Sequence, residues 1–295
     1  MGFALNVNNM KIAILGKGGS GKSTVSWLLV NHFSVNNPKN KVLAIDADHN
    51  MDLMANLGVD MTNKLPVFYK ANEEIRTLAG MSQNGRWGVY LDLEPLTLSY
   101  NPSSNIIEKY LTPVAKNIDL MTMGLGEDDI MYADKCAHGL SGHFKYILPT
   151  LAVKPKDLLL IDSVAGADML NYGLYYGTDI VCVVVEGHKN SIKVATQLKE
   201  IADKQGINLK FILNKYNSEN PLIIEFQKKF NESVLGFLPN DTGVLELDYA
   251  KVSSEMKNAL TDLSKKINLE AIIPDKAKHA NLKKFELEKR KLNPQ

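Results

Sequence analysis

The sequence has few cysteines and no long apolar run, and these absences narrow the classes of protein to which it can belong. Only 2 cysteines, Cys136 and Cys182, occur among 295 residues, and they lie far apart. This disfavours a disulfide framework and suits a reducing cytosol. No uninterrupted apolar stretch reaches the roughly 20 residues that a membrane-spanning helix needs. We therefore expect a cytoplasmic protein without a transmembrane segment.

The sequence also lacks a strong excess of charge of either sign. Its formal net charge is +1, which gives no indication of a nucleic-acid or anionic-membrane partner. Residues 1–9 are neither basic nor followed by the apolar core of a signal peptide. Hydrophobic residues make up 45% of the chain and charged residues 23%, which leaves ample material for a core.

Short apolar runs alternate along the chain with segments of helical spacing. Most of these runs are continuous rather than alternating, which is typical of strands buried on both faces by helices. We therefore predict an α/β fold with a doubly wound, mainly parallel sheet flanked by helices. The predicted strands are residues 11–15, 42–45, 118–121, 158–161, 180–185, 209–213 and 234–237.

The remaining segments complete the predicted organisation. Residues 60–117 are interrupted by glycine and proline and predict helices and loops over one edge of the sheet. Apolar residues at helical spacing predict a packing helix over residues 252–267. We assign residues 1–273 to a single domain and residues 274–295 to a basic C-terminal tail. The tail predicts a solvated helix or frayed end, with a membrane-surface or nucleic-acid contact as the alternative.

The residues from Gly16 to Ser23 match the P-loop pattern, in which glycine and four further residues precede Gly-Lys-Ser/Thr. The glycines let backbone N–H groups point at phosphate oxygens, and the following helix directs the positive end of its dipole there. We expect Lys22 to reach the β- and γ-phosphates and Ser23 to ligate Mg²⁺. The sequence thus predicts an ATP/ADP site, with the phosphate cradle formed by Gly18, Gly19, Ser20, Gly21, Lys22, Ser23 and Thr24.

A second lysine, Lys17, lies among the glycines, although the ordinary cradle does not require it and its own loop offers it no evident partner. The run from Lys17 to Thr24 resembles the deviant Walker A motif of one P-loop branch. That branch contains the septum-site and plasmid-partition ATPases, nitrogenase iron protein and the carbon monoxide dehydrogenase accessory ATPase. The resemblance implies that Lys17 crosses a dimer interface to the partner's phosphates, so that two subunits enclose two ATP molecules. A solvated surface lysine is the alternative.

Acidic residues follow two of the predicted strands, where the carboxyl ends of parallel strands face a ligand crevice. The resemblance implies that Asp48 orients the attacking water and that Asp46 lies nearer the Mg²⁺ shell. Capping of the following helix is the alternative for either carboxylate. Asp162 can hold Mg²⁺ through water, and Gly166 lets the backbone approach the γ-phosphate. Residues 162–166 resemble the family's Walker B motif and second switch.

Two further segments indicate the side of the site that holds the base. Asn214 and Lys215 follow a predicted strand, and an asparagine amide offers both a donor and an acceptor to the edge of adenine. The run that contains Pro239 and Asp241 follows the next strand and resembles the family's adenine-side loop. We therefore assign these four residues to nucleotide binding.

Within the branch, the sequence is most similar to the accessory ATPases for nickel insertion into carbon monoxide dehydrogenase. Those proteins carry a Cys-x-Cys pair that meets its copy across the dimer and binds metal. Here the corresponding positions are Cys136 and His138, and His143 is a further candidate. Two thiolates and two imidazoles would form a tetrahedral set suited to Zn²⁺ and acceptable to Ni²⁺. A small buried hydrophobe is the alternative for Cys136, and Cys182 is expected to be one.

These features together predict a magnesium-dependent, slowly hydrolysing ATPase that works as a nucleotide-switched homodimer. Lys17, Lys22 and Asp48 are its predicted catalytic residues, and its predicted role is metallocentre assembly on a client metalloenzyme. A positioning or partition ATPase acting on membrane or DNA is the alternative. A regulatory protein that binds nucleotide without hydrolysing it is a third reading. An iron–sulfur electron donor is disfavoured, because Cys182 lies within an apolar strand.

Overall fold

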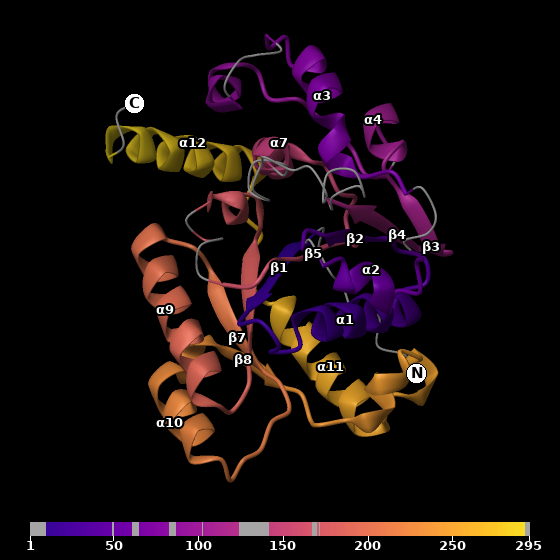
Figure 1. The fold of residues 1–295 in the computed structure, drawn as a ribbon, viewed down its shortest axis with the longest axis vertical. Helices are drawn as coiled ribbons and strands as arrows, with labels where there is room; N and C mark the ends of the chain where they lie inside the picture. Colours follow the sequence, from indigo (N-terminus) through magenta and orange to yellow (C-terminus); the bar gives the residue numbers. More distant parts are fainter. Residues whose placement is uncertain are drawn as a thin grey trace.

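A sheet of eight strands forms the centre of the molecule, in the order β3-β4-β2-β5-β1-β6-β7-β8 (Figure 1). β3 is antiparallel to β4, and all other neighbouring pairs are parallel. The computed structural model describes residues 10–48, 50–60, 65–82, 87–101, 103–123, 142–166, 170 and 172–292. The strands are β1 (Met10–Gly16), β2 (Val42–Asp46), β3 (Thr112–Ala115), β4 (Ile118–Thr122), β5 (Leu158–Asp162), β6 (Ile180–Val185), β7 (Leu209–Leu213) and β8 (Val234–Phe237).

Helices cover both faces of this sheet, which confirms the predicted doubly wound fold. One core lies between the sheet and a layer that includes α9 and α10, and a second lies between the sheet and α1, α2 and α11 (Figure 1). Every residue of β1, β2, β4, β5 and β6 is buried, which explains their continuous apolar sequences. The α-helices are α1 (Lys22–Asn36), α2 (Asp52–Asn56), α3 (Asn72–Leu78), α4 (Asn105–Glu108), α7 (Gly142–Ile147), α9 (Lys189–Gln205), α10 (Pro221–Phe230), α11 (Ser254–Ile267) and α12 (Asp275–Leu292).

The described parts of residues 60–117 form short helices at the β4 edge of the sheet, and they add one strand that the sequence did not predict. This strand, β3, continues the sheet beyond β4. Its burial alternates between half-buried and exposed residues, so it lacks the continuous apolar run of the inner strands. Short 3₁₀ turns complete the described structure: η1 (Phe68–Ala71), η2 (Trp87–Asp92), η3 (Leu148–Thr150), η4 (Leu174–Gly177), η5 (Asn231–Ser233), η6 (Thr242–Glu246) and η7 (Tyr249–Lys251).

The last helix, α12, is docked on the domain, contrary to the expected solvated or frayed tail. It packs against η2, η3 and η4, and Lys278, Leu282 and Glu286 are buried. Glu286 Oε1 lies 2.8 Å from Nζ of Lys145, itself a buried residue of α7. Counting apolar positions missed this contact, because two of these three buried positions are charged residues with partners on the domain. No helix among the described residues combines the length and apolarity that crossing a membrane requires.

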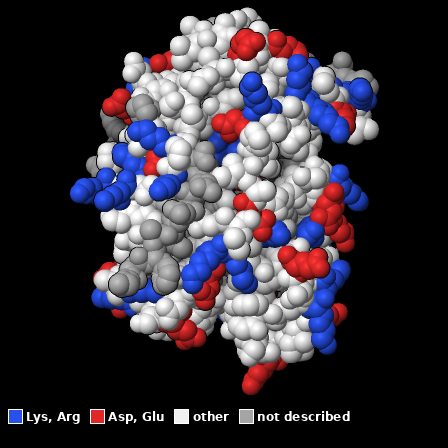
Figure 2. Space-filling model, turned by 180° about the vertical axis from the view of Figure 1, so that it is seen from behind, with Lys and Arg blue, Asp and Glu red and all other residues white. Residues whose placement is uncertain are grey.

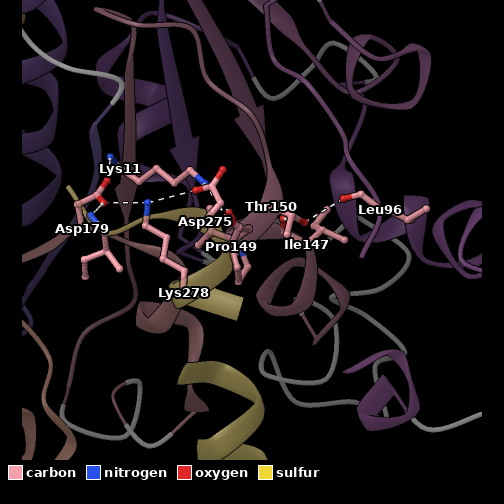
Figure 3. A network of polar contacts seen from close by, with 10 residues as sticks. Lys11, Leu96, Ile147, Pro149, Thr150, Asp179, Asp275 and Lys278 are labelled. Atoms are coloured by element: carbon pink, nitrogen blue, oxygen red, sulfur yellow. Dashed lines mark hydrogen bonds and ion pairs between the residues drawn. The ribbon is translucent and has the colours of Figure 1, made fainter. Parts of the chain in front are cut away.

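A buried network of charges ties the first turn of α12 to the amino end of the sheet (Figure 3). Lys11 Nζ in β1 donates to two carbonyl oxygens of η3, at 2.9 and 3.0 Å, and lies 3.0 Å from Asp275 Oδ1. Lys278 Nζ lies 2.8 Å from Oδ1 of Asp179, which directly precedes β6. Asp179 also accepts hydrogen bonds from the backbone N–H groups of Lys11 and Ile273. Each buried charge in this network therefore has an opposite charge beside it.

Candidate nucleotide-binding site

The P-loop joins the central strand β1 to α1 at the carboxyl edge of the sheet. Gly19 and Gly21 have φ values of 81° and 85°, which favour glycine. A Cβ on Gly21 would lie 2.5 Å from Asn214 Nδ2, and one on Gly16 would lie 2.7 Å from the Val184 carbonyl oxygen. The loop therefore requires glycine both for backbone conformation and for close approach of its neighbours.

The amino end of α1 is arranged to receive an anion. Its N-cap residue, Gly21, makes no side-chain cap, so the first amide groups of the helix have no side-chain acceptor there. Lys22 and Ser23 open the helix and are buried. This geometry agrees with a phosphate cradle; the individual phosphate contacts of residues 18–24 stay predictions.

Lys17 has a partner within its own loop, contrary to expectation. Its Nζ donates to the carbonyl oxygen of Gly18 at 3.2 Å, and its own carbonyl accepts from the Ser20 N–H at 3.1 Å. The side chain is half-buried. Its role across a dimer interface stays a prediction.

Two carboxylates lie side by side where β2 and β5 end. Asp46 and Asp162 are partners in the parallel register, and both are fully buried. Asp46 accepts from the N–H groups of Asp48 at 3.1 Å and Met54 at 2.8 Å. Met54 belongs to the first turn of α2, so Asp46 satisfies one backbone amide of that turn, although the N-cap residue of α2 is Met51. Asp162 Oδ1 accepts from the Ser26 hydroxyl at 2.9 Å.

The environment of this pair disfavours two negative charges. Burial, and then the charge of Asp162, raise the pKa of Asp46 to about 8 against the two backbone hydrogen bonds that it accepts. Burial raises the pKa of Asp162 to about 6, opposed by the hydroxyls of Ser23 and Ser26 and by the charge of Lys22. A cation beside the pair would relieve this cost.

The donor set fits Mg²⁺ bound together with a nucleotide. Asp162 Oδ2 and Ser20 Oγ are buried and have no hydrogen-bond partner among the described residues. Mg²⁺ usually takes one or two carboxylates and completes its shell with phosphate oxygens and water, so it needs no cage of protein ligands. Accordingly, the described residues contain no group of three or more His, Cys, Asp or Glu side chains that could hold a metal. Ser23 and Asp162 would hold the ion, with Asp46 beside them.

The predicted water-orienting residue, Asp48, is buried next to the pair. Its backbone N–H is bound to Asp46, and its Oδ1 accepts from the Asn50 N–H at 3.1 Å. Asp48 is only 7% exposed. The structure thus brings Asp46, Asp48 and Asp162 together beside the P-loop, although their roles stay predictions.

Asn214 contacts the P-loop directly. Its Nδ2 donates to the Ser20 carbonyl oxygen at 3.1 Å, and the side chain is buried. Lys215 is exposed, and its Nζ lies 2.8 Å from Glu186 Oε1 at the end of β6. No motif in the sequence marks Glu186 as the partner of Lys215. A base contact by Asn214 or Lys215 stays a prediction.

On the β8 side, the Asp241 carboxylate makes contacts within the chain. Oδ1 accepts from the Gly243 N–H and Oδ2 from the Ser253 N–H, both at 2.9 Å. Although burial opposes it, these hydrogen bonds and that of the Ser253 hydroxyl lower the pKa of Asp241. Asp241 thus shapes the loop after Pro239, which is half-buried; an adenine contact by either residue stays a prediction.

The predicted transition-metal residues, Cys136 and His138, lie outside the described residues. His143 is described, and it is not available to a metal shared between subunits. It is 1% exposed, its Nε2 lies 3.0 Å from the Phe68 carbonyl oxygen, and its ring stacks on that of Phe68. Cys182 is a buried free cysteine, as expected.

Comparison with known families identifies the class to which this fold and site belong. The model described as the CobQ/CobB/MinD/ParA nucleotide binding domain matches residues 11–254. The chain therefore belongs to this family, which confirms the resemblance carried by the run from Lys17 to Thr24.

Individual relatives within the family are similar along most of the chain. An uncharacterized ATP-binding protein of Methanocaldococcus jannaschii is 28% identical over 239 residues, which cover 80% of this chain and 90% of the relative. The carbon monoxide dehydrogenase accessory protein CooC of Rhodospirillum rubrum is 28% identical over 249 residues, which cover 83% and 89%.

A solved structure shows the same fold. The septum site-determining protein MinD of Pyrococcus horikoshii, complexed with Mg-ADP, aligns with a TM-score of 0.60 at 20% identity, covering 88% of this chain and 95% of that one.

Proposed function

We propose that this protein is a magnesium-dependent ATPase of low turnover that acts as an ATP-switched homodimer in the cytoplasm. The observation that carries the proposal is the pair Asp46 and Asp162, two neighbouring buried carboxylates with raised pKa values beside a glycine cradle and a helix amino terminus. Such a site favours a divalent cation and a polyphosphate together. The ATP-binding relative and the MinD complex with Mg-ADP support the choice of ligand.

The chain's own residues would position the reactants rather than form covalent intermediates. Lys22 would neutralise charge on the transferring phosphoryl group, and Lys17 of the second subunit would complete that neutralisation. Mg²⁺, when bound, supplies further positive charge at the phosphate oxygens. Asp48 would hold the attacking water through its carboxylate. Loss of the γ-phosphate would remove these contacts and loosen the dimer.

For the dimeric role, we propose metallocentre assembly on a client metalloenzyme. The similarity to CooC along 83% of the chain supports this role. Cys136 and His138 of two subunits would hold about one Zn²⁺ or Ni²⁺ ion. Metal analysis of the purified dimer tests this: Cys136→Ala should lose the metal, and equal metal content in both proteins would contradict it.

The second candidate function is that of a positioning or partition ATPase, which the fold shared with MinD keeps open. Such a protein would bind membrane or DNA when it holds ATP. In α12, however, Lys278, Leu282 and Glu286 are buried against the domain. On the face of the molecule that Figure 2 shows, basic and acidic side chains are interspersed. Co-sedimentation with anionic vesicles or DNA distinguishes the two candidate functions. ATP-dependent binding would favour a positioning or partition role over metallocentre assembly.

The experiment that tests the ATP switch measures dimerisation and phosphate release together. With ATP and Mg²⁺, light scattering should show a dimer for the wild type and a monomer for Lys17→Ala, while that monomer still binds nucleotide. Lys39→Ala removes an exposed lysine elsewhere and should dimerise as the wild type does. Unchanged dimerisation of Lys17→Ala would refute the trans role, and absence of phosphate release from the wild type would favour a nucleotide binder without hydrolysis.

A further inference from the structure

One hydroxyl outside the P-loop motif contacts the buried carboxylate pair. Ser26 lies in α1 three residues after Ser23, so the two side chains share a face of the helix. Ser26 is completely buried, and its Oγ donates to Asp162 Oδ1 at 2.9 Å. A serine inside a helix can satisfy its hydroxyl on the carbonyl four residues back. Here the hydroxyl instead crosses from α1 to the end of β5.

This hydrogen bond separates the roles of the two Asp162 oxygens. Oδ1 is engaged by Ser26, whereas Oδ2 is buried without a hydrogen-bond partner among the described residues. Burial raises the pKa of Asp162, and the Ser26 hydroxyl opposes that rise together with the Ser23 hydroxyl and the charge of Lys22. A donor on Oδ1 restricts rotation of the carboxylate and leaves Oδ2 as its open acceptor.

We propose that Ser26 is a positioning residue, which holds Asp162 so that Oδ2 faces the Mg²⁺ or a water molecule bound to it. This inference rests on the proposed function, because it requires the site to bind a nucleotide with Mg²⁺. Ser26 touches neither the nucleotide nor the ion in this scheme. It acts only through the orientation of Asp162, so its loss should weaken the contribution of Mg²⁺ and leave nucleotide binding without the ion intact.

The test is equilibrium titration of the full chain with a fluorescent ATP analogue, in MgCl₂ and in EDTA. For Ser26→Ala, the Mg²⁺ concentration that gives half-maximal binding should rise about tenfold, the typical effect of one hydrogen bond to a charged group. Affinity in EDTA should stay within about twofold of the wild type, and saturating Mg²⁺ should restore binding. Ser26→Thr, which keeps the hydroxyl, should recover most of the loss.

A matched control lies on the same helix. Ser34 Oγ donates to Asn117 Oδ1 at 2.7 Å, at the other end of α1 from the P-loop. Ser34→Ala removes one hydroxyl and one hydrogen bond from α1 but should leave the Mg²⁺ dependence unchanged.

Two outcomes would overturn the inference. One is that Ser26→Ala needs the same Mg²⁺ concentration for half-maximal binding as the wild type. The other is an equal shift in Ser26→Ala and Ser34→Ala, which would assign the effect to the stability of α1. Both leave the proposed function standing. A wild type that binds the analogue equally in MgCl₂ and EDTA would instead contradict the proposed function, and the inference would fall with it.

Discussion

Both ends of the central sheet bury charged side chains, but the charges are paired with opposite charges at one end and lie beside like charges at the other. At the amino end, Lys11 and Lys278 lie between Asp179 and Asp275 (Figure 3). At the carboxyl end, Asp46 and Asp162 lie side by side, and burial raises the pKa of each, although the charge of Lys22 opposes the rise for Asp162. Paired opposite charges are typical of structural networks, whereas carboxylates with raised pKa values are typical of sites that bind a ligand. The contrast agrees with a candidate site at the carboxyl end of the sheet.

The largest loss in the free energy of unfolding should come from breaking the network of paired charges at the amino end of the sheet. Asp179→Ala leaves the buried ammonium group of Lys278 without its nearest carboxylate, a change that typically costs about 3 to 5 kcal/mol. Urea denaturation should show that loss in the free energy of unfolding. Asp203→Ala removes the exposed partner of Lys199 and should cost less than about 1 kcal/mol. Similar losses for both variants would mean that the network is not structural.

At the carboxyl end, the ligand rather than the protein should provide the stabilisation. ATP with Mg²⁺ at about 100 times its dissociation constant should stabilise the wild type by about 2.7 kcal/mol, seen as a rise in melting temperature. EDTA should remove much of this gain. Asp162→Asn should lose the part that depends on Mg²⁺, because the amide cannot replace the carboxylate charge. An undiminished Mg²⁺ effect in that variant would place the ion elsewhere.

His32 lies at neither end of the sheet and has no charged partner among the described residues. It tests how much the burial of one titratable group lowers the free energy of unfolding in acid. Burial lowers the pKa of His32 from 6.5 to about 4, and its Nδ1 lies 2.6 Å from the Tyr249 hydroxyl oxygen. Between these two pKa values the unfolded chain binds more protons than the folded one, so stability falls as the pH falls. From pH 6.5 to 4.5, the wild type should lose about 2 kcal/mol more than His32→Gln. Parallel losses in acid denaturation curves would exclude His32 as the cause.

The smallest expected change is a gain in the free energy of unfolding, opposite in sign to the loss expected for Asp179→Ala. Asp46→Asn removes one of two neighbouring carboxylates and keeps one carbonyl oxygen that can accept from the Met54 N–H, but its amide nitrogen cannot accept from the Asp48 N–H. We expect the nucleotide-free protein to gain about 1 kcal/mol of stability, since functional sites often carry such costs. Urea denaturation in EDTA measures it. A loss of stability would show that the hydrogen bonds of Asp46 to the Asp48 and Met54 amides outweigh the cost of burying its carboxylate.

Features that depend on local sequence pattern could be predicted, whereas features that depend on long-range contacts could not. The inner strands are apolar at nearly every position, and glycine spacing marks the P-loop, so both follow from local pattern. The α12 contact depends on Lys278 and Glu286, whose partners lie far away in the sequence. Ser26 was missed because a serine within a helix carries no motif, although its three-residue spacing from Ser23 could have drawn notice. Such features require the distances that only a folded chain provides.

The bond between Lys11 and Asp275 also joins two parts of the chain that are synthesised at widely separated times. Lys11 belongs to the central strand and is 2% exposed, yet its carboxylate partner is 264 residues further along the chain. Until Asp275 has been synthesised, burial of the Lys11 ammonium group lacks this counter-charge and is unfavourable. We therefore expect Lys11, in the strand that leads into the P-loop, to become fully buried only after Asp275 has emerged.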